Sequence, residues 1–206
     1  PLRQLLKTVR KQPAGHSPRQ RNQYLTEHKL RVAYNRAFYQ RLSELAGKLR
    51  SETDKINPKL SYWLLPAIQG DFLTTVGKAL ATPEAPLVVT NEDTYGKPSL
   101  AVSDRDAVES NVAKCKDDLQ YLEQHKIPYI YLAAIMGDLD PRYHGKQAIE
   151  MGKVCDGIWL WELSKVDHYK YGRDNLMKIL TVANREIREG TFNIPPEWEQ
   201  DDQQHR

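Results

Sequence analysis

Four short apolar runs, separated by stretches of helical periodicity, constrain the fold of this chain more than any other feature. They cover residues 60–66, 87–90, 127–135 and 157–161. Each run is nearly continuous in apolar residues instead of alternating with polar ones, which is typical of strands buried on both faces of a parallel sheet. The sequence therefore predicts an α/β protein built from parallel β/α units.

Helices are predicted around each of these strands. A long amphipathic helix over 18–52 precedes the first strand, with Ser17 as its N-cap and Pro18 in its first turn, after a short helix over 2–12. Ser103 caps a helix that continues to about residue 125. The other predicted helices cover 71–81, 146–153 and 172–189. We expect residues 1–194 to form a single domain and 195–206 to form a loose acidic tail.

This order is compatible with a small open sheet or with half of an eight-stranded barrel. In both folds the functional residues lie on the loops after the carboxyl ends of the strands. These loops are rich in carboxylates and aromatic side chains, a combination that suits a sugar, since rings stack on the sugar C–H faces and carboxylates accept from its hydroxyls. No glycine-rich phosphate loop occurs in the sequence.

Three stretches of the sequence resemble the second half of a barrel glycoside hydrolase. Leu87-Val-Val-Thr-Asn-Glu92 resembles the acid/base strand of retaining enzymes, and Asp156-Gly-Ile-Trp-Leu-Trp-Glu-Leu163 resembles their eighth strand. The helix that ends at Asn57-Pro-Lys-Leu-Ser61 looks like the fourth barrel helix running into the fifth strand. The resemblance covers about 18–190 and implies strands five to eight of a TIM-type (β/α)8 barrel.

The resemblance also implies a glycosidase site that needs no cofactor and no metal. Glu92 and Glu162 would be the catalytic carboxylates, and Trp161 would stack on the sugar while Trp159 serves packing. The residues expected to orient sugar hydroxyls are Asn91, Tyr95, Asp138 and His144.

Two other classes of function stay open. One is a noncatalytic carbohydrate-binding or scaffold protein on a barrel fold, because a fold does not fix a function. The other is a nucleic-acid-binding protein, since residues 1–60 hold fourteen Lys and Arg against four Asp and Glu. We favour a solvated helix face, or a face that packs on acidic protein, over nucleic acid.

The predicted partners follow from the same considerations. Half of a closed barrel leaves two strand edges unpaired, near 60–66 and 157–161, so we expect additional polypeptide to complete the barrel. No apolar stretch is long enough to predict a membrane span, and the compartment is left open. Cys115 and Cys155 lack metal-ligand spacing, and a disulfide between them is left open.

Overall fold

The computed structural model describes residues 17–65, 68–95, 103–136, 140–161 and 172–199. Its centre is a sheet of four strands in the order β1-β2-β3-β4, and every neighbouring pair is parallel. The strands are β1 (Trp63–Leu64), β2 (Leu87–Asn91), β3 (Tyr129–Met136) and β4 (Gly157–Trp161). The predicted α/β class with parallel β/α units is therefore confirmed, although β1 is shorter than the run 60–66.

The helices between the strands agree with the sequence pattern, with one shifted boundary. A π-helical turn (Leu73–Gly77) continues into α4 (Lys78–Leu80), α5 covers Asp104–Gln124 and α7 covers Arg173–Glu189. Helix α6 (Pro141–Gly152) begins five residues before the predicted 146. Asp140 caps this helix by accepting from the backbone N–H of Arg142, and Pro141 fits its first turn, so the helix includes residues 141–145, which precede its predicted start.

The long basic helix predicted over 18–52 is two helices. Helix α2 (Pro18–Glu27) begins as predicted, with the Ser17 hydroxyl accepting from the backbone N–H of Gln20, and α3 (Arg31–Ile56) follows a short break. At the break Lys29 has a φ of 54°, and the N–H of Leu30 donates to the carbonyl of Leu25 across it. This left-handed turn ends α2 as a glycine would, but no glycine marks it in the sequence.

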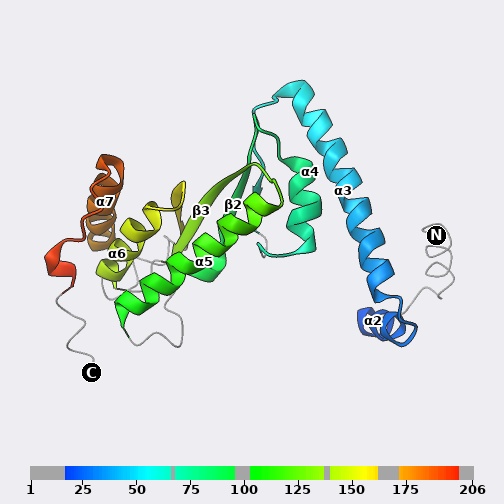
Figure 1. Ribbon diagram of the computed structural model, residues 1–206, viewed down its shortest axis with the longest axis horizontal. Coiled ribbons are helices and arrows are strands. Elements are labelled where there is room, and N and C mark those ends of the chain that lie inside the picture. Colours follow the sequence, from blue (N-terminus) through cyan, green and yellow to red (C-terminus); the bar gives the residue numbers. More distant parts are fainter. Residues whose placement is uncertain (1–16, 66–67, 96–102, 137–139, 162–171, 200–206) are drawn as a thin grey trace.

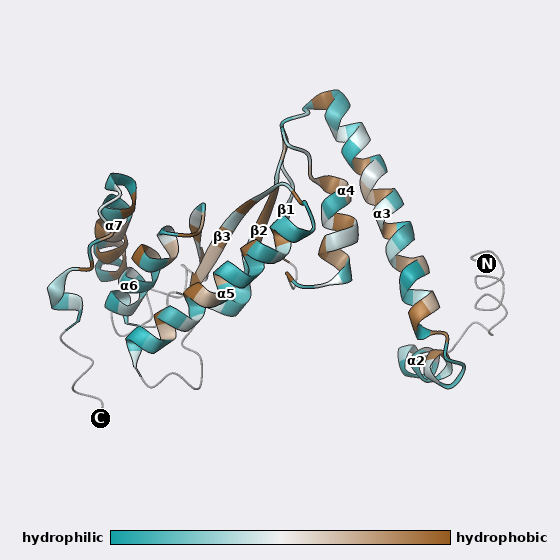
Figure 2. Cartoon of the chain, viewed as in Figure 1, coloured by the Kyte–Doolittle hydropathy of each residue, from teal (hydrophilic) through white to brown (hydrophobic). Residues whose placement is uncertain are grey.

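The helices lie on one side of the sheet. Consecutive parallel strands joined by right-handed crossovers place their helices on the same face, and in Figure 1 α3, α4, α5, α6 and α7 follow one another in chain order from right to left. Leu87, Val89 and Tyr131 point from the sheet into the main core, where they join Cys115 and Leu122 of α5. The strands are accordingly among the most hydrophobic segments in Figure 2.

The other face of the sheet is apolar but only partly buried. Strand alternation and register assign it Trp63, Val88, Ile130, Leu132 and Trp159. None of these five side chains belongs to the apolar clusters that join the described strands to their helices. We call this surface the open face. Its exposure differs from the sequence expectation that both faces of the strands are covered.

The C-terminal segment packs on the domain instead of beginning a loose tail at 195. A 3-10 turn, η4 (Pro196–Trp198), places Trp198 against Ala148, Ile149 and Ala183 of α6 and α7. The described part of the domain thus continues past 194 to the buried Trp198. Cys115 and Cys155 are free thiols. Among the described helices, none combines the length and the hydrophobicity that a membrane crossing requires.

Candidate functional site at the carboxyl ends of the strands

An aromatic cluster lies on the open face and extends from the middle of the sheet to the turn after β2. It consists of Trp63 of β1, Trp159 of β4 and Tyr95, which follows β2. The rings of Trp63 and Trp159 meet edge to face, with centroids 5.6 Å apart and planes at 83°. The Tyr95 ring is 5.8 Å from that of Trp159. Residues from three separate β/α units therefore form one surface.

Trp63 is the most accessible member of this cluster that the structure places in a strand. Its side chain extends from the edge strand across to β2, where Nε1 donates a hydrogen bond of 2.6 Å to Oγ1 of the buried Thr90. Even so, 51% of the residue is exposed. Because its polar atom is already bonded within the protein, the indole can offer a ring surface to a ligand without losing that bond.

The turn after β2 is fixed firmly at the same edge of the sheet. Asn91 is followed by a 3-10 turn, η2 (Glu92–Thr94), whose Thr94 hydroxyl accepts from the backbone N–H of Ala134 in β3 at 3.0 Å. The amide of Gln147 in α6 donates to the carbonyl of Thr94 at 2.6 Å. These bonds hold the turn against β3 and α6. Glu92 is exposed on this anchored turn.

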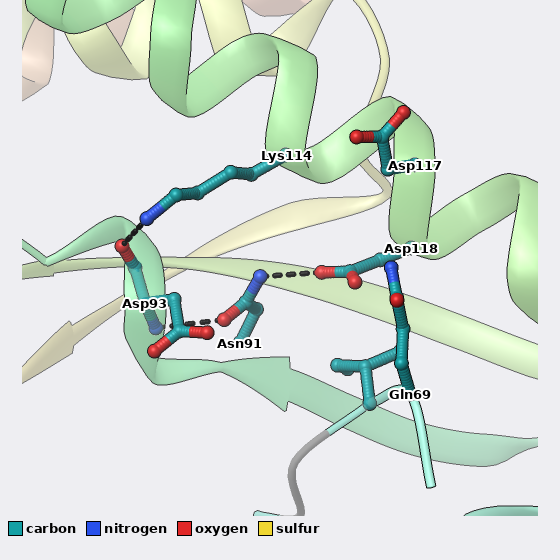
Figure 3. A pocket seen from close by; sticks show the side chains of 7 residues that line it. Gln69, Asn91, Asp93, Lys114, Asp117 and Asp118 are labelled. Carbon is teal, nitrogen blue, oxygen red and sulfur yellow. Dashed lines mark hydrogen bonds between the residues drawn. The ribbon is translucent and has the colours of Figure 1, made fainter.

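A polar pocket lies on the opposite, helix-covered side of β2. Its volume is about 320 Å³, and Figure 3 shows Asn91 between Asp93 and Asp118, with Lys114 extending from α5 to the Asp93 carbonyl at 3.1 Å. The lining residues are Ile68, Gln69, Asn91, Asp93, Lys114, Asp117 and Asp118. Three carboxylates against one lysine favour a cationic or hydroxyl-bearing group over a phosphate.

Asp118 is the buried acid of this pocket. Its Oδ2 accepts from the amide of Asn91 and, at 2.9 Å, from the hydroxyl of Tyr131. Burial raises the pKa of the Asp118 carboxyl, and these two hydrogen bonds oppose the rise without cancelling it. The three residues connect α5 to β2 and β3, so their first effect is to hold the helix on the sheet.

The predicted site residues are only partly brought together. Glu92 and Tyr95 lie at the strand ends as expected. Asn91 shares its face with Leu87 and Val89, so its side chain lines the polar pocket and does not accompany the aromatic cluster. The sheet separates the polar pocket from the aromatic cluster, and the prediction that Asn91 orients sugar hydroxyls stays a prediction.

His144 also lies elsewhere than predicted. It belongs to the first turns of α6 and not to a loop, and its side chain is completely buried beside Tyr143, with ring centroids 5.6 Å apart. A ligand at the surface cannot reach it there. The expectation that His144 lies on a loop is wrong, and its role in orienting sugar hydroxyls stays a prediction.

Three predicted residues remain without a described side chain. Glu162 and Asp138 lie outside the described residues, and Trp161 is described only as the last residue of β4. The separation of the two predicted catalytic carboxylates stays a prediction. Trp159, which was expected to pack, contacts both Trp63 and Tyr95.

Sequence reasoning missed two residues that the structure makes prominent. Trp63 gave no signal beyond belonging to a short apolar run, because the alternation that puts it on the open face depends on the register with Val88. Asp118 reads as an ordinary acid in an amphipathic helix. Only its position one turn after Lys114, and three residues after the apolar Cys115, hints that it faces the sheet.

A second cavity lies away from this edge of the sheet. A groove of about 790 Å³ lies between α5, α6 and the C-terminal segment, lined mainly by long charged side chains such as Arg105, Glu109 and Glu150. The described residues contain no group of three or more His, Cys, Asp or Glu arranged to hold a metal ion. The aromatic cluster remains the best candidate site.

Comparisons with known proteins add nothing to this geometry. No protein-family model, curated protein or solved structure matches the chain at a significant level. What this α/β chain does must be argued from its own open face and from the residues at the carboxyl ends of its strands.

Proposed function

We propose that this chain is the second half of a (β/α)8 barrel and binds an oligosaccharide at the carboxyl ends of its strands. The observation that carries the proposal is the accessible indole of Trp63, held by Thr90 and backed edge-on by Trp159. A rigid ring with its polar atom satisfied suits the weakly polar C–H face of a sugar ring.

The sheet itself supports the barrel part of the proposal. Its strands are all parallel and lie in chain order, and the connecting helices α4, α5 and α6 share a core with one face of the sheet, which is the arrangement of consecutive units in such a barrel. In that fold the open face would look into the barrel. Active sites of barrel enzymes lie at the carboxyl ends of the strands, and Tyr95 of the aromatic cluster follows the carboxyl end of β2.

Glu92 and Glu162 are the proposed catalytic pair for hydrolysis of the bound glycoside. Glu92 is the first residue after β2, and Glu162 is the first after β4, so one strand separates their positions. Strands about 4.8 Å apart put the two backbones roughly 10 Å apart, and side chains that lean inward can then meet the separations that glycosidases use, about 5–9.5 Å. One carboxyl would protonate the leaving oxygen while the other acts as base or nucleophile.

The basic helices fit a nucleic acid less well. Arg50 is buried and bonds to Asp54 and to the carbonyl of Leu60, and Arg41 pairs with Glu44 at 2.8 Å. Part of the positive charge of α3 is therefore used within the fold. The exposed Tyr34 and Phe38 stack with one another along α3, with ring centroids 6.2 Å apart.

The test is binding of soluble oligosaccharides, with a panel of cello-, xylo-, manno- and chito-oligosaccharides titrated by calorimetry. Trp63→Ala should weaken binding at least tenfold, or about 1.4 kcal/mol, whereas Phe72→Ala, another exposed aromatic outside the open face, should not. Glu162→Gln and Glu92→Gln should abolish hydrolysis and leave binding in place. Binding without hydrolysis in the unmodified chain would favour the noncatalytic alternative, and no binding to any member of the panel would overturn the proposal.

A further inference from the structure

We infer that the open face is covered by a polypeptide that contributes four parallel strands and three helices and that is acidic where it meets α3, and not by a second copy of this chain. The inference rests on the barrel architecture proposed above and goes beyond it, because it specifies the composition of what completes the ring.

Both the open face and the outer edges of β1 and β4 need to be covered by polypeptide. Within the described residues, β1 pairs only with β2 and β4 only with β3, so each keeps one edge of unpaired backbone groups. Between these edges the open face presents Trp63, Ile130 and Leu132, and Leu65 at the border is 52% exposed. Unpaired parallel edges beside apolar surface are seldom left in water.

The number of helices decides against a second copy. In a (β/α)8 barrel one helix lies outside each seam between neighbouring strands. The described part of this chain has a helix before its first strand and another after its last strand, since α3 precedes β1 and α7 follows β4. If two copies closed a ring around a twofold axis, β4 of one would meet β1 of the other, and α7 and α3 would both belong outside that seam.

That seam has no room for two helices. Helix α3 has 26 residues and α7 has 17, and each helix is about 10 Å across with its side chains. Both are already placed by their neighbours. Ala46 of α3 joins the core under α4, and Ile187 of α7 packs where a Cβ on Gly152 of α6 would lie 2.7 Å away. A ring of eight strands needs eight helices outside its seams. The described part of this chain supplies five of them, α3 to α7, so the polypeptide that completes the ring, here called the complement, must bring three.

Helix α3 carries a second apolar side that such a complement would use. Leu42 and Ala46 pack into the core, while Phe38, Leu45 and Leu49 are each about half exposed. A helix outside a barrel seam packs on the strands at both sides of the seam. The exposed residues are therefore suited to cover the strand that would pair with the free edge of β1.

The positive charge of α2 and α3 indicates that the complement is acidic where it meets them. Residues 17–49, which include α2 and most of α3, hold seven Lys and Arg and two Glu. A second copy would bring the same positive charge to the seam. An acidic surface on the incoming helices would pair with it, so the association should weaken as salt increases.

The experiment mixes the 206-residue chain with an idealised half barrel of four strands and three helices that carries acidic residues on its last helix. Sedimentation should give a one-to-one complex, and hydrogen exchange at Trp63–Leu64 and along Gly157–Trp161 should slow at least tenfold on mixing. Leu132→Asp on the open face and Leu49→Asp on α3 should each prevent the complex. Phe72→Asp, at an exposed position outside the open face and outside both end seams, should not.

Two results would overturn the inference. One is a discrete homodimer in which the edges of β1 and β4 are already protected. The other is failure of the folded chain to form the complex with the half barrel at low salt. Leu49 is half exposed, so its variant keeps the test valid if Leu132→Asp does not fold. The assembly is measured without sugar, so its outcome is independent of the oligosaccharide titration.

Discussion

The indole of Trp63 is bonded through Nε1 to Oγ1 of Thr90, which fixes a side chain of the edge strand to the strand beside it. This bond matters because β1 is short. Its described ladder with β2 consists of two residue pairs, Trp63 with Val88 and Leu64 with Val89. The hydrogen bond from Trp63 to Thr90 therefore contributes substantially to keeping β1 paired with β2.

Thr90→Val should loosen β1. Valine keeps the shape of threonine but cannot accept from the indole, so we expect the free energy of unfolding to fall by about 1 kcal/mol and quenching of tryptophan fluorescence by acrylamide to rise. Urea denaturation measures the first effect. Thr181→Val is the matched control, because the Thr181 hydroxyl bonds only within α7. Equal effects of the two substitutions would contradict this role of Thr90.

Asp118 should make stability depend on pH. Burial raises its pKa in the folded chain, so the folded state holds this proton more tightly than the unfolded state does. The resulting stabilisation is complete below the ordinary aspartate pKa, about 3.9, and is lost as the pH rises through the raised value. The difference in unfolding free energy between the unmodified chain and Asp118→Asn should therefore decrease as the pH is raised from that value toward neutrality.

The control for this pH series is Asp117→Asn. It removes the same charge from the neighbouring position of α5, where the side chain is exposed. Denaturant titrations across the pH range give both differences. A stability difference for Asp118→Asn that is constant, or that grows with pH, would mean that burial does not dominate the environment of this carboxyl.

Two glycines should respond to alanine in opposite directions. At Gly145 a Cβ would lie 2.6 Å from the Trp198 ring, so Gly145→Ala should cost about 1–3 kcal/mol by overpacking. At Gly47 of α3 nothing lies within 4 Å of that position, so Gly47→Ala should stabilise the helix by about 0.5–1 kcal/mol. Thermal unfolding of both variants checks the signs, and a tolerated Gly145→Ala would show that Trp198 does not pack tightly on α6.

Lys29→Gly should stabilise the break between α2 and α3. Lys29 holds a φ of 54°, which costs an L-residue about 1 kcal/mol that glycine does not incur. We expect a gain of several tenths of a kcal/mol, because glycine also loses more entropy on folding. Lys48→Gly, within the regular part of α3, should lose stability instead. A loss with Lys29→Gly would indicate a continuous helix in solution.

The elements that could be predicted from the sequence are those with local causes. Helix α5 begins where Ser103 accepts from the N–H of Asp106, and α2 begins where Ser17 and Gln20 form a capping box. Both helix starts can therefore be predicted from the residues that form the cap. The break at Lys29 cannot be predicted in this way, because the surrounding chain imposes the left-handed conformation on a residue type that does not favour it.

The candidate site was harder to predict than the fold, since it depends on which face of a strand a side chain occupies. Asn91 and Trp159 each lie in an apolar strand, where periodicity gives no polar face to assign. Register then places Asn91 beside Asp118 and Trp159 beside Trp63. His144 and Gly145 precede the predicted start of their helix at 146, but both are helical, and the absence of a Cβ at Gly145 makes room for Trp198.

The order of the strands has a consequence for how the chain can be synthesised. Paired residues are 25 positions apart between β1 and β2, 42 between β2 and β3 and 25 between β3 and β4. Each strand therefore finds its partner in the segment most recently made, and no strand must wait for a distant part of the chain. The sheet can grow by one β/α unit at a time as the polypeptide leaves the ribosome, with each new strand adding to the free edge of the last.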